Sequence, residues 1–173
     1  MAKIFLVGMM GVGKSHWAGK LARKLSVPHY DLDEMIEQQE GQSITEIFAT
    51  QGEAAFRQIE SGTLRKLTEG GDFVMATGGG APCQPGNMDY MNRMGITIWL
   101  DEPLEIIIGR LRQGREARPL VASLADHELR AYIATKLAER SVFYKQATYR
   151  LSGKEISAAT FEQLIQQHNE YHE

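Results

Sequence analysis

The chain has 173 residues, of which 43% are hydrophobic and 24% charged, a composition typical of one globular domain with a sizeable core. Its 19 basic and 22 acidic residues give a net charge of −3, so charge gives no reason to expect a nucleic acid or an anionic membrane as a partner. The single cysteine, Cys83, allows no internal disulfide, and no apolar run approaches the roughly 20 residues of a membrane span. These features favour a protein of the cytoplasm.

Short apolar runs rich in β-formers alternate with stretches of helical spacing in the first half of the chain. We expect strands over 3–7, 27–33 and 72–77, and helices over 15–25, 33–40, 43–50 and 53–67. Ser43 and Glu46 stand at the spacing of a capping box, and Gly41 and Gly52 mark the ends of two of these helices.

The same alternation continues in the second half. We expect strands over 95–100 and 148–151, and helices over 104–111, 125–146 and 158–168. The segment 112–119, "RQGREARP", is too polar and too rich in Gly and Pro to stay helical. Five apolar strands separated by helices predict an α/β fold with a parallel sheet, in a single domain over 1–173.

The stretch "GMMGVGKS" directly follows the first apolar strand. Gly8, Gly13, Lys14 and Ser15 match the pattern G-x-x-x-x-G-K-[ST] between a strand and a helix. Glycines let several backbone N–H groups approach phosphate oxygens, and the helix N-terminus adds its positive end. We expect Lys14 to reach the β- and γ-phosphates and the Ser15 hydroxyl to bind Mg²⁺. The full match in this context predicts a nucleoside triphosphate site rather than a chance glycine turn.

This loop is shared by switch GTPases, motor ATPases and small-molecule kinases. A GTPase needs a guanine-reading motif such as Asn-Lys-x-Asp, but Asn87, Asn92 and Asn169 are followed by Met, Arg and Glu. A motor is usually a larger protein. A kinase needs a second site, for the acceptor of the phosphoryl group.

Two acids, Asp31 and Asp33, end the second predicted strand. The carboxyl ends of parallel strands face the ligand crevice, so one acid could lie near Mg²⁺ and the other on a substrate hydroxyl. The alternative is that Asp33 only caps the helix that follows.

Two further segments have both a functional and a purely structural interpretation. Arg57 and Glu60, at i and i+3 on one predicted helix, form either a surface ion pair or an arginine held ready for an anionic substrate. The stretch from Thr77 to Gly80, "TGGG", is either a plain turn or a place where backbone N–H groups approach a polar ligand.

Arginines are concentrated in "RLRQGREARPL". Arg110, Arg112, Arg115 and Arg118 lie in either a solvated loop or a lid that closes over phosphates and supplies cations. Arg140, in "LAERSVFY", is isolated, and taken alone it is a surface residue of a helix.

Together, "GMMGVGKS", "DLDEMIE", "SITEIFATQGEAAFRQIE", "ATGGGA", "RPL" and "ERSVFY" occur in an order and spacing that resemble the shikimate kinase family. The resemblance covers most of the chain, from Lys3 to Leu151. It implies a P-loop kinase of the nucleoside-monophosphate-kinase type, a three-layer α/β/α fold with a five-stranded parallel sheet of order 2-3-1-4-5. It also implies a substrate-binding helical insert at 33–61 and a lid at 112–124.

The activity that the resemblance implies is transfer of phosphate from ATP, with Mg²⁺, to the 3-hydroxyl of shikimate in aromatic amino-acid biosynthesis. The expected partner is this small molecule alone, with no nucleic acid and no membrane, and the expected state is a monomer.

The resemblance also implies site residues, matched position by position. For catalysis they are Lys14, Asp33 and Arg118. For the nucleotide they are Gly11, Val12, Gly13, Lys14, Ser15, His16, Arg112, Arg118 and Lys154. For shikimate they are Asp33, Arg57, Gly78, Gly79, Gly80 and Arg140, of which the two arginines hold the carboxylate. For Mg²⁺ they are Ser15 and, through water, Asp31.

The chain departs from the family pattern just after the phosphate loop. The family usually has Thr after Lys-Ser, and often Gly two positions later, where this chain has His16 and Ala18. His16 either donates to a phosphate oxygen or simply occupies the start of the helix. Because lid length varies in the family, Arg110 and Arg115 are alternatives to Arg112 for the adenine contact.

Three rival functions remain open from the sequence. They are another small-molecule kinase of the same fold, such as a gluconate-type enzyme, a regulatory nucleotide switch, and an inactive scaffold paralogue.

Overall fold

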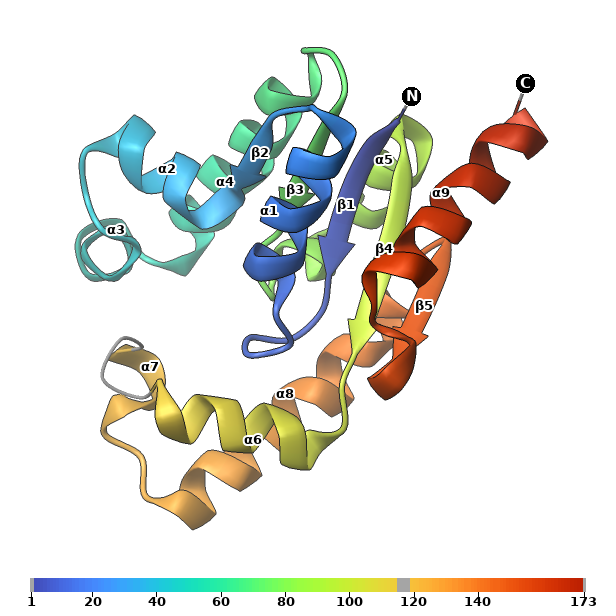
Figure 1. The fold of residues 1–173 in the computed structure, drawn as a ribbon. Coiled ribbons are helices and arrows are strands. Elements are labelled where there is room, and N and C mark those ends of the chain that lie inside the picture. The colour runs from blue at the N-terminus through green and yellow to red at the C-terminus, as the bar shows by residue number, and fades with distance from the viewer. Residues whose placement is uncertain (1, 115–118, 173) are drawn as a thin grey trace.

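The structure is a computed structural model, and it describes residues 2–114 and 119–172. Its centre is a parallel sheet of order β2-β3-β1-β4-β5, which confirms the parallel sheet predicted from the sequence and the strand order that the family resemblance implied (Figure 1). The strands are β1 (Lys3–Val7), β2 (His29–Asp31), β3 (Phe73–Ala76), β4 (Ile96–Asp101) and β5 (Tyr149–Ser152). The central strands are buried on both faces, which explains why they are nearly continuous apolar runs in the sequence.

Two helices, α1 (Lys14–Leu25) and α9 (Ala158–His172), lie side by side over one face of the sheet (Figure 1). They are joined by an aromatic contact between Trp17 and Phe161, whose ring centroids are 5.3 Å apart. This face thus connects the helix of the phosphate loop to the last helix of the chain.

The other face is covered by α4 (Glu53–Thr68), α5 (Asn87–Met94) and α8 (Asp126–Tyr144) (Figure 1). A hydrogen bond of 3.0 Å from Arg65 Nη1 to Asn87 Oδ1 links α4 to α5. Helices on both faces of a parallel sheet confirm the three-layer arrangement.

Smaller elements surround the carboxyl ends of the strands. Helices α2 (Leu32–Glu40) and α3 (Ile44–Gln51) lie beyond the β2 side of the sheet, and α6 (Leu104–Gln113) with α7 (Pro119–Ala122) lies below it in the view of Figure 1. Two 3₁₀ turns, η1 (Ala81–Cys83) and η3 (Gly153–Glu155), follow β3 and β5. None of the helices in the described ranges is both long and apolar enough to cross a bilayer.

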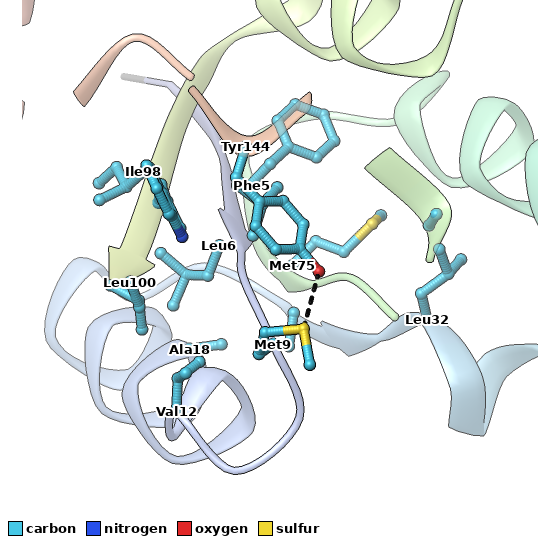
Figure 2. Close-up of a cluster of buried hydrophobic side chains, with 14 of the residues drawn as sticks. Phe5, Leu6, Met9, Val12, Ala18, Leu32, Met75, Ile98, Leu100 and Tyr144 are labelled. Carbon is cyan, nitrogen blue, oxygen red and sulfur yellow. Dashed lines mark hydrogen bonds between the residues drawn. The ribbon is translucent and has the colours of Figure 1, made fainter. Parts of the chain in front are cut away.

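The core lies on both sides of β1. Figure 2 shows Phe5 and Leu6 of β1 packed with Met75, Ile98 and Tyr144 from neighbouring elements, all of them fully buried. Close packing of this kind fixes the ends of the strands, and the loops that extend from them, in one arrangement.

Strand β2 is shorter than the expected span 27–33, because helix α2 begins at Leu32. The N-cap of α2 is Asp31, whose Oδ1 accepts from the backbone N–H of Asp33 at 3.2 Å and of Glu34 at 3.3 Å. The interpretation of Asp33 as a helix cap is therefore wrong, and its carboxylate is available for another purpose.

Helix α5 was not expected from its polar sequence. It begins after Gly86, which has a φ of 78°, and it buries Met88 and Met91 against the sheet. The polar segment from 112 is also partly helical, because α6 continues through Gln113 and Pro119 starts α7.

Candidate active site

The phosphate loop joins β1 to α1 through a sharp bend. Gly11 and Gly13 have φ values of 81° and 94°, a left-handed conformation that glycine adopts at little cost. A Cβ at Gly8 would lie 2.7 Å from the carbonyl oxygen of Leu100. Glycines thus keep side chains out of this bend and leave its backbone open to an anion. The first N–H groups of α1, which have no partner within the helix, point toward the same place.

Lys14 and Ser15 start α1 directly behind this loop. Lys14 Nζ donates to the carbonyl oxygens of Gly8 at 2.7 Å and Met9 at 2.8 Å, so the ammonium group lies across the loop. Ser15 Oγ donates to Asp31 Oδ2 at 2.5 Å. A hydroxyl and a carboxylate oxygen at this point suit Mg²⁺, which uses one or two protein ligands beside phosphate oxygens and water.

A cavity of about 410 Å³ opens beside the loop. It is lined by the loop, the start of α1, the ends of β2 and β3, and α6. The lining residues are Met10, Gly11, Gly13, Lys14, Ser15, His16, Asp31, Asp33, Thr77, Gly78, Gly79 and Arg110. We call it the nucleotide cavity.

A second cavity, of about 160 Å³, is lined by the helices of the insert, the glycine turn after β3, and α8. Its lining residues are Met10, Asp33, Ile44, Phe48, Phe56, Arg57, Glu60, Gly78, Gly79, Gly80 and Arg140. We call it the acceptor cavity. Met10, Asp33, Gly78 and Gly79 line both cavities, so the two spaces meet at one carboxylate and one glycine turn.

The three glycines at 78–80 each face a different charged group. An added Cβ would lie 2.9, 2.8 and 2.6 Å from side-chain atoms of Asp33, Arg140 and Arg57, respectively. The absence of side chains here lets a carboxylate and two guanidinium groups converge on one backbone segment.

Arg57 and Glu60 form a buried pair on α4. Arg57 Nη1 donates to Glu60 Oε1 at 2.9 Å, and Glu60 is only 1% exposed. Burial raises the pKa of Glu60, while the neighbouring guanidinium of Arg57 opposes that rise. The surface ion pair considered from the sequence is therefore excluded, and the pair holds Arg57 at the acceptor cavity.

Asp33 lies where the cavities join. Burial, and then the negative charge of Asp31, raises the pKa of its carboxyl, while Lys14 lowers it. A carboxylate with a raised pKa is a better proton acceptor than one in water.

Arg110 and Arg112 of the arginine-rich segment lie in different surroundings. Arg110 lines the nucleotide cavity, and its Nη1 donates to the carbonyl of Gly11 at 3.2 Å. Arg112 instead approaches Asp126 at the start of α8, with 3.6 Å between Nε and Oδ2. Of these two, Arg110 is thus the one beside the nucleotide cavity.

The other expected nucleotide contacts fall into three groups. Arg115 and Arg118 lie outside the described residues. His16 lines the nucleotide cavity, and the side chain of Val12, a residue of the loop itself, is buried at 1% exposure. Lys154 is exposed in η3 and is not among the described lining residues of either cavity.

Several residues of the site were not singled out from the sequence. Ile44, Phe48 and Phe56 form an apolar wall of the acceptor cavity, where helical spacing alone indicated only packing. Tyr144 is fully buried behind the glycine turn, and its spacing of four residues from Arg140 on a helix was the available signal.

Comparisons with known proteins find close relatives of this chain. A family model described as shikimate kinase matches residues 10–169. A shikimate kinase of Bacteroides fragilis is 43% identical over 149 residues, which are 86% of this chain and 83% of that protein.

Solved structures show the same likeness. The crystal structure of a shikimate kinase from Bacteroides thetaiotaomicron superposes with a TM-score of 0.86 at 38% identity, covering 98% of this chain and 97% of that one. A shikimate kinase from Acinetobacter baumannii in complex with shikimate gives a TM-score of 0.84 at 30% identity, covering 99% and 94%.

Proposed function

Since the chain belongs to the shikimate kinase family, we propose that it transfers the γ-phosphoryl group of ATP to the 3-hydroxyl of shikimate where its two cavities meet. The observation that most supports this is the sharing of Asp33, Gly78 and Gly79 between the cavities. A donor in one space and an acceptor in the other would then have their reacting atoms side by side, as direct transfer requires.

On the acceptor side, Asp33 orients the attacking hydroxyl and takes its proton. Arg57 and Arg140 bind the carboxylate of shikimate with charge-assisted hydrogen bonds, and the glycine turn offers backbone contacts from Gly78 to Gly80. The apolar wall at Phe48 and Phe56 covers the ring and excludes water.

On the donor side, the backbone of the loop at 11–13 and the Lys14 ammonium group hold the phosphates. Ser15, with Asp31 through water, holds Mg²⁺, which neutralises charge on the phosphate oxygens. His16 lies at the cavity beside these groups. A lid at 112–124, including Arg118, and a contact from Lys154 complete the proposed nucleotide site.

We also propose that the protein works as a monomer in the cytoplasm. The single cysteine suits a reducing compartment. Size-exclusion chromatography with light scattering tests the monomer.

An assay of ADP release tests the function. We expect release to require Mg²⁺ and to rise strongly when shikimate is added, with shikimate 3-phosphate as the product. Phosphorylation of gluconate but not of shikimate would identify the gluconate-type kinase, and nucleotide binding without any acceptor-dependent turnover would favour the regulatory switch.

Arg140 provides a test of the carboxylate contact. Replacing Arg140 with alanine is expected to raise the KM for shikimate roughly ten- to hundredfold, because a charge-assisted bond in a partly desolvated site is lost. The KM for ATP should stay near the wild-type value. An unchanged KM for shikimate in steady-state kinetics would mean that Arg140 does not touch the substrate.

A matched pair of variants, Arg110→Gln and Arg112→Gln, tests which arginine makes the contact with adenine. We assign it to Arg110, so Arg110→Gln should raise the KM for ATP roughly three- to tenfold, a modest effect because this guanidinium is half exposed and screened. Arg112→Gln, which removes the exposed contact to Asp126, should change the KM for ATP by less than about twofold. If Arg112→Gln raises the KM for ATP more than Arg110→Gln does, Arg112 is the residue that contacts adenine.

A further inference from the structure

Tyr144 ends helix α8 beneath the point where the cavities meet. It has 0% exposure and is the largest fully buried side chain among the described residues. Its ring packs at a tilt against Trp99 of β4, with the centroids 5.8 Å apart. The ring is therefore held in place by the core, and its hydroxyl points away from β4 toward the loops (Figure 2).

That hydroxyl touches both loops between which a phosphoryl group would pass. It donates to the carbonyl oxygen of Gly79 at 2.6 Å. It also lies 3.7 Å from the sulfur of Met9 in the phosphate loop, the contact drawn as a dashed line in Figure 2. Gly79 and Met10, the neighbour of Met9, both line the two cavities.

Arg140 lies one helical turn before Tyr144 and faces the same glycine. A Cβ at Gly79 would lie 2.8 Å from Arg140 Nη1 and 3.6 Å from the Tyr144 hydroxyl. One face of α8 thus provides both a substrate-facing guanidinium and the hydroxyl that anchors the adjoining turn.

We propose that Tyr144 is a positioning residue for phosphoryl transfer, whose hydroxyl holds the Gly79 peptide of the acceptor cavity at a fixed distance from the phosphate loop at Met9. This inference rests on the proposed kinase function. Transfer requires reacting atoms about 3–3.5 Å apart, and a misplacement of about 1 Å can cost about a hundredfold in rate. Burial also raises the pKa of the Tyr144 phenol, so the hydroxyl stays protonated and remains a donor.

The test is Tyr144→Phe, which removes only the hydroxyl. We expect the single-turnover rate of phosphoryl transfer from ATP to shikimate to fall about ten- to hundredfold, with the KM for ATP changed less than about twofold. The matched control is Tyr90→Phe. The Tyr90 hydroxyl is hydrogen-bonded to Thr68 between α5 and α4, and Tyr90 is not among the described lining residues of either cavity.

Melting curves and binding of MgADP are measured for both variants. A Tyr144→Phe protein that binds MgADP normally but transfers slowly, beside a Tyr90→Phe protein that transfers at the wild-type rate, supports the positioning role. Wild-type transfer by Tyr144→Phe overturns it, and so does a loss of MgADP binding that parallels the loss of transfer. If the wild-type protein itself does not phosphorylate shikimate, the proposed function fails first and this inference fails with it.

Discussion

Replacing Asp33 with asparagine is expected to lower single-turnover phosphoryl transfer about a hundredfold or more, while ATP binding stays normal. The change removes the negative charge and the proton-accepting oxygen but keeps the shape of the side chain. General-base effects range from about 10²- to 10⁴-fold, and the loose transition state of phosphoryl transfer places the expectation in the lower half of that range.

The same variant should be at least as stable as the wild type. Asp31, not Asp33, caps α2, so no cap is lost. Burial raises the pKa of Asp33 in the folded protein, so above the usual pKa of an aspartate the ionised carboxylate is more favourable in the unfolded chain, and this lowers the stability of the fold. The amide of asparagine is neutral and removes that cost. Melting curves should show an unchanged or higher Tm.

The control is Glu34→Gln, which changes an exposed acid one residue further along α2. This variant should leave both transfer and Tm unchanged. Near-wild-type transfer by Asp33→Asn would show that something else orients the hydroxyl.

Replacing Arg57 with alanine is expected to lower the free energy of unfolding by about 3–5 kcal/mol and to raise the KM for shikimate. The loss of stability arises from Glu60, which is 1% exposed: without its partner at 2.9 Å, its carboxyl must either stay charged in the interior or take up a proton, and both cost stability. Denaturant unfolding measures the first effect and steady-state kinetics the second.

A double variant separates the two effects of Arg57. Arg57→Ala combined with Glu60→Gln removes the buried charge, so most of the lost stability should return while the KM for shikimate stays high. If the KM also recovers, Arg57 acts only through the fold. If Arg57→Ala alone is fully stable, the ion pair is not what holds Glu60 in the interior.

The phosphate loop could be predicted because it depends on local pattern, whereas the sheet order came only from the resemblance to a known family. The loop needs glycines and Lys-Ser at fixed spacing between a strand and a helix, and those residues are adjacent in the sequence.

The roles of the two acids after β2 were harder to predict. Asp31 and Asp33 are separated by one residue, so both fit the position of a cap, and only the actual start of α2 at Leu32 decides between them.

Other features depend on contacts that no local pattern reveals. Helix α5 is stabilised mainly by burial of Met88 and Met91 against the sheet, so its polar sequence gave little indication of it. Arg110 and Arg112 are two residues apart on α6 and thus point in different directions, one to the nucleotide cavity and one to Asp126. Tyr144 ends the segment "ERSVFY", but its contact with Gly79 joins residues 65 positions apart.

The glycine turn at 78–80 also restricts how this site can change by mutation. Alanine, the smallest possible replacement, would bring a methyl group against Asp33, Arg140 or Arg57, depending on which of the three positions is changed. At Gly78 the methyl group would also lie 3.2 Å from Glu60, the partner of Arg57, so a substitution there affects more than one recognition group. A side chain at any of these positions would displace a charged group that faces the acceptor cavity, so substitutions at these glycines and at the charged residues facing them are coupled in their effect on specificity.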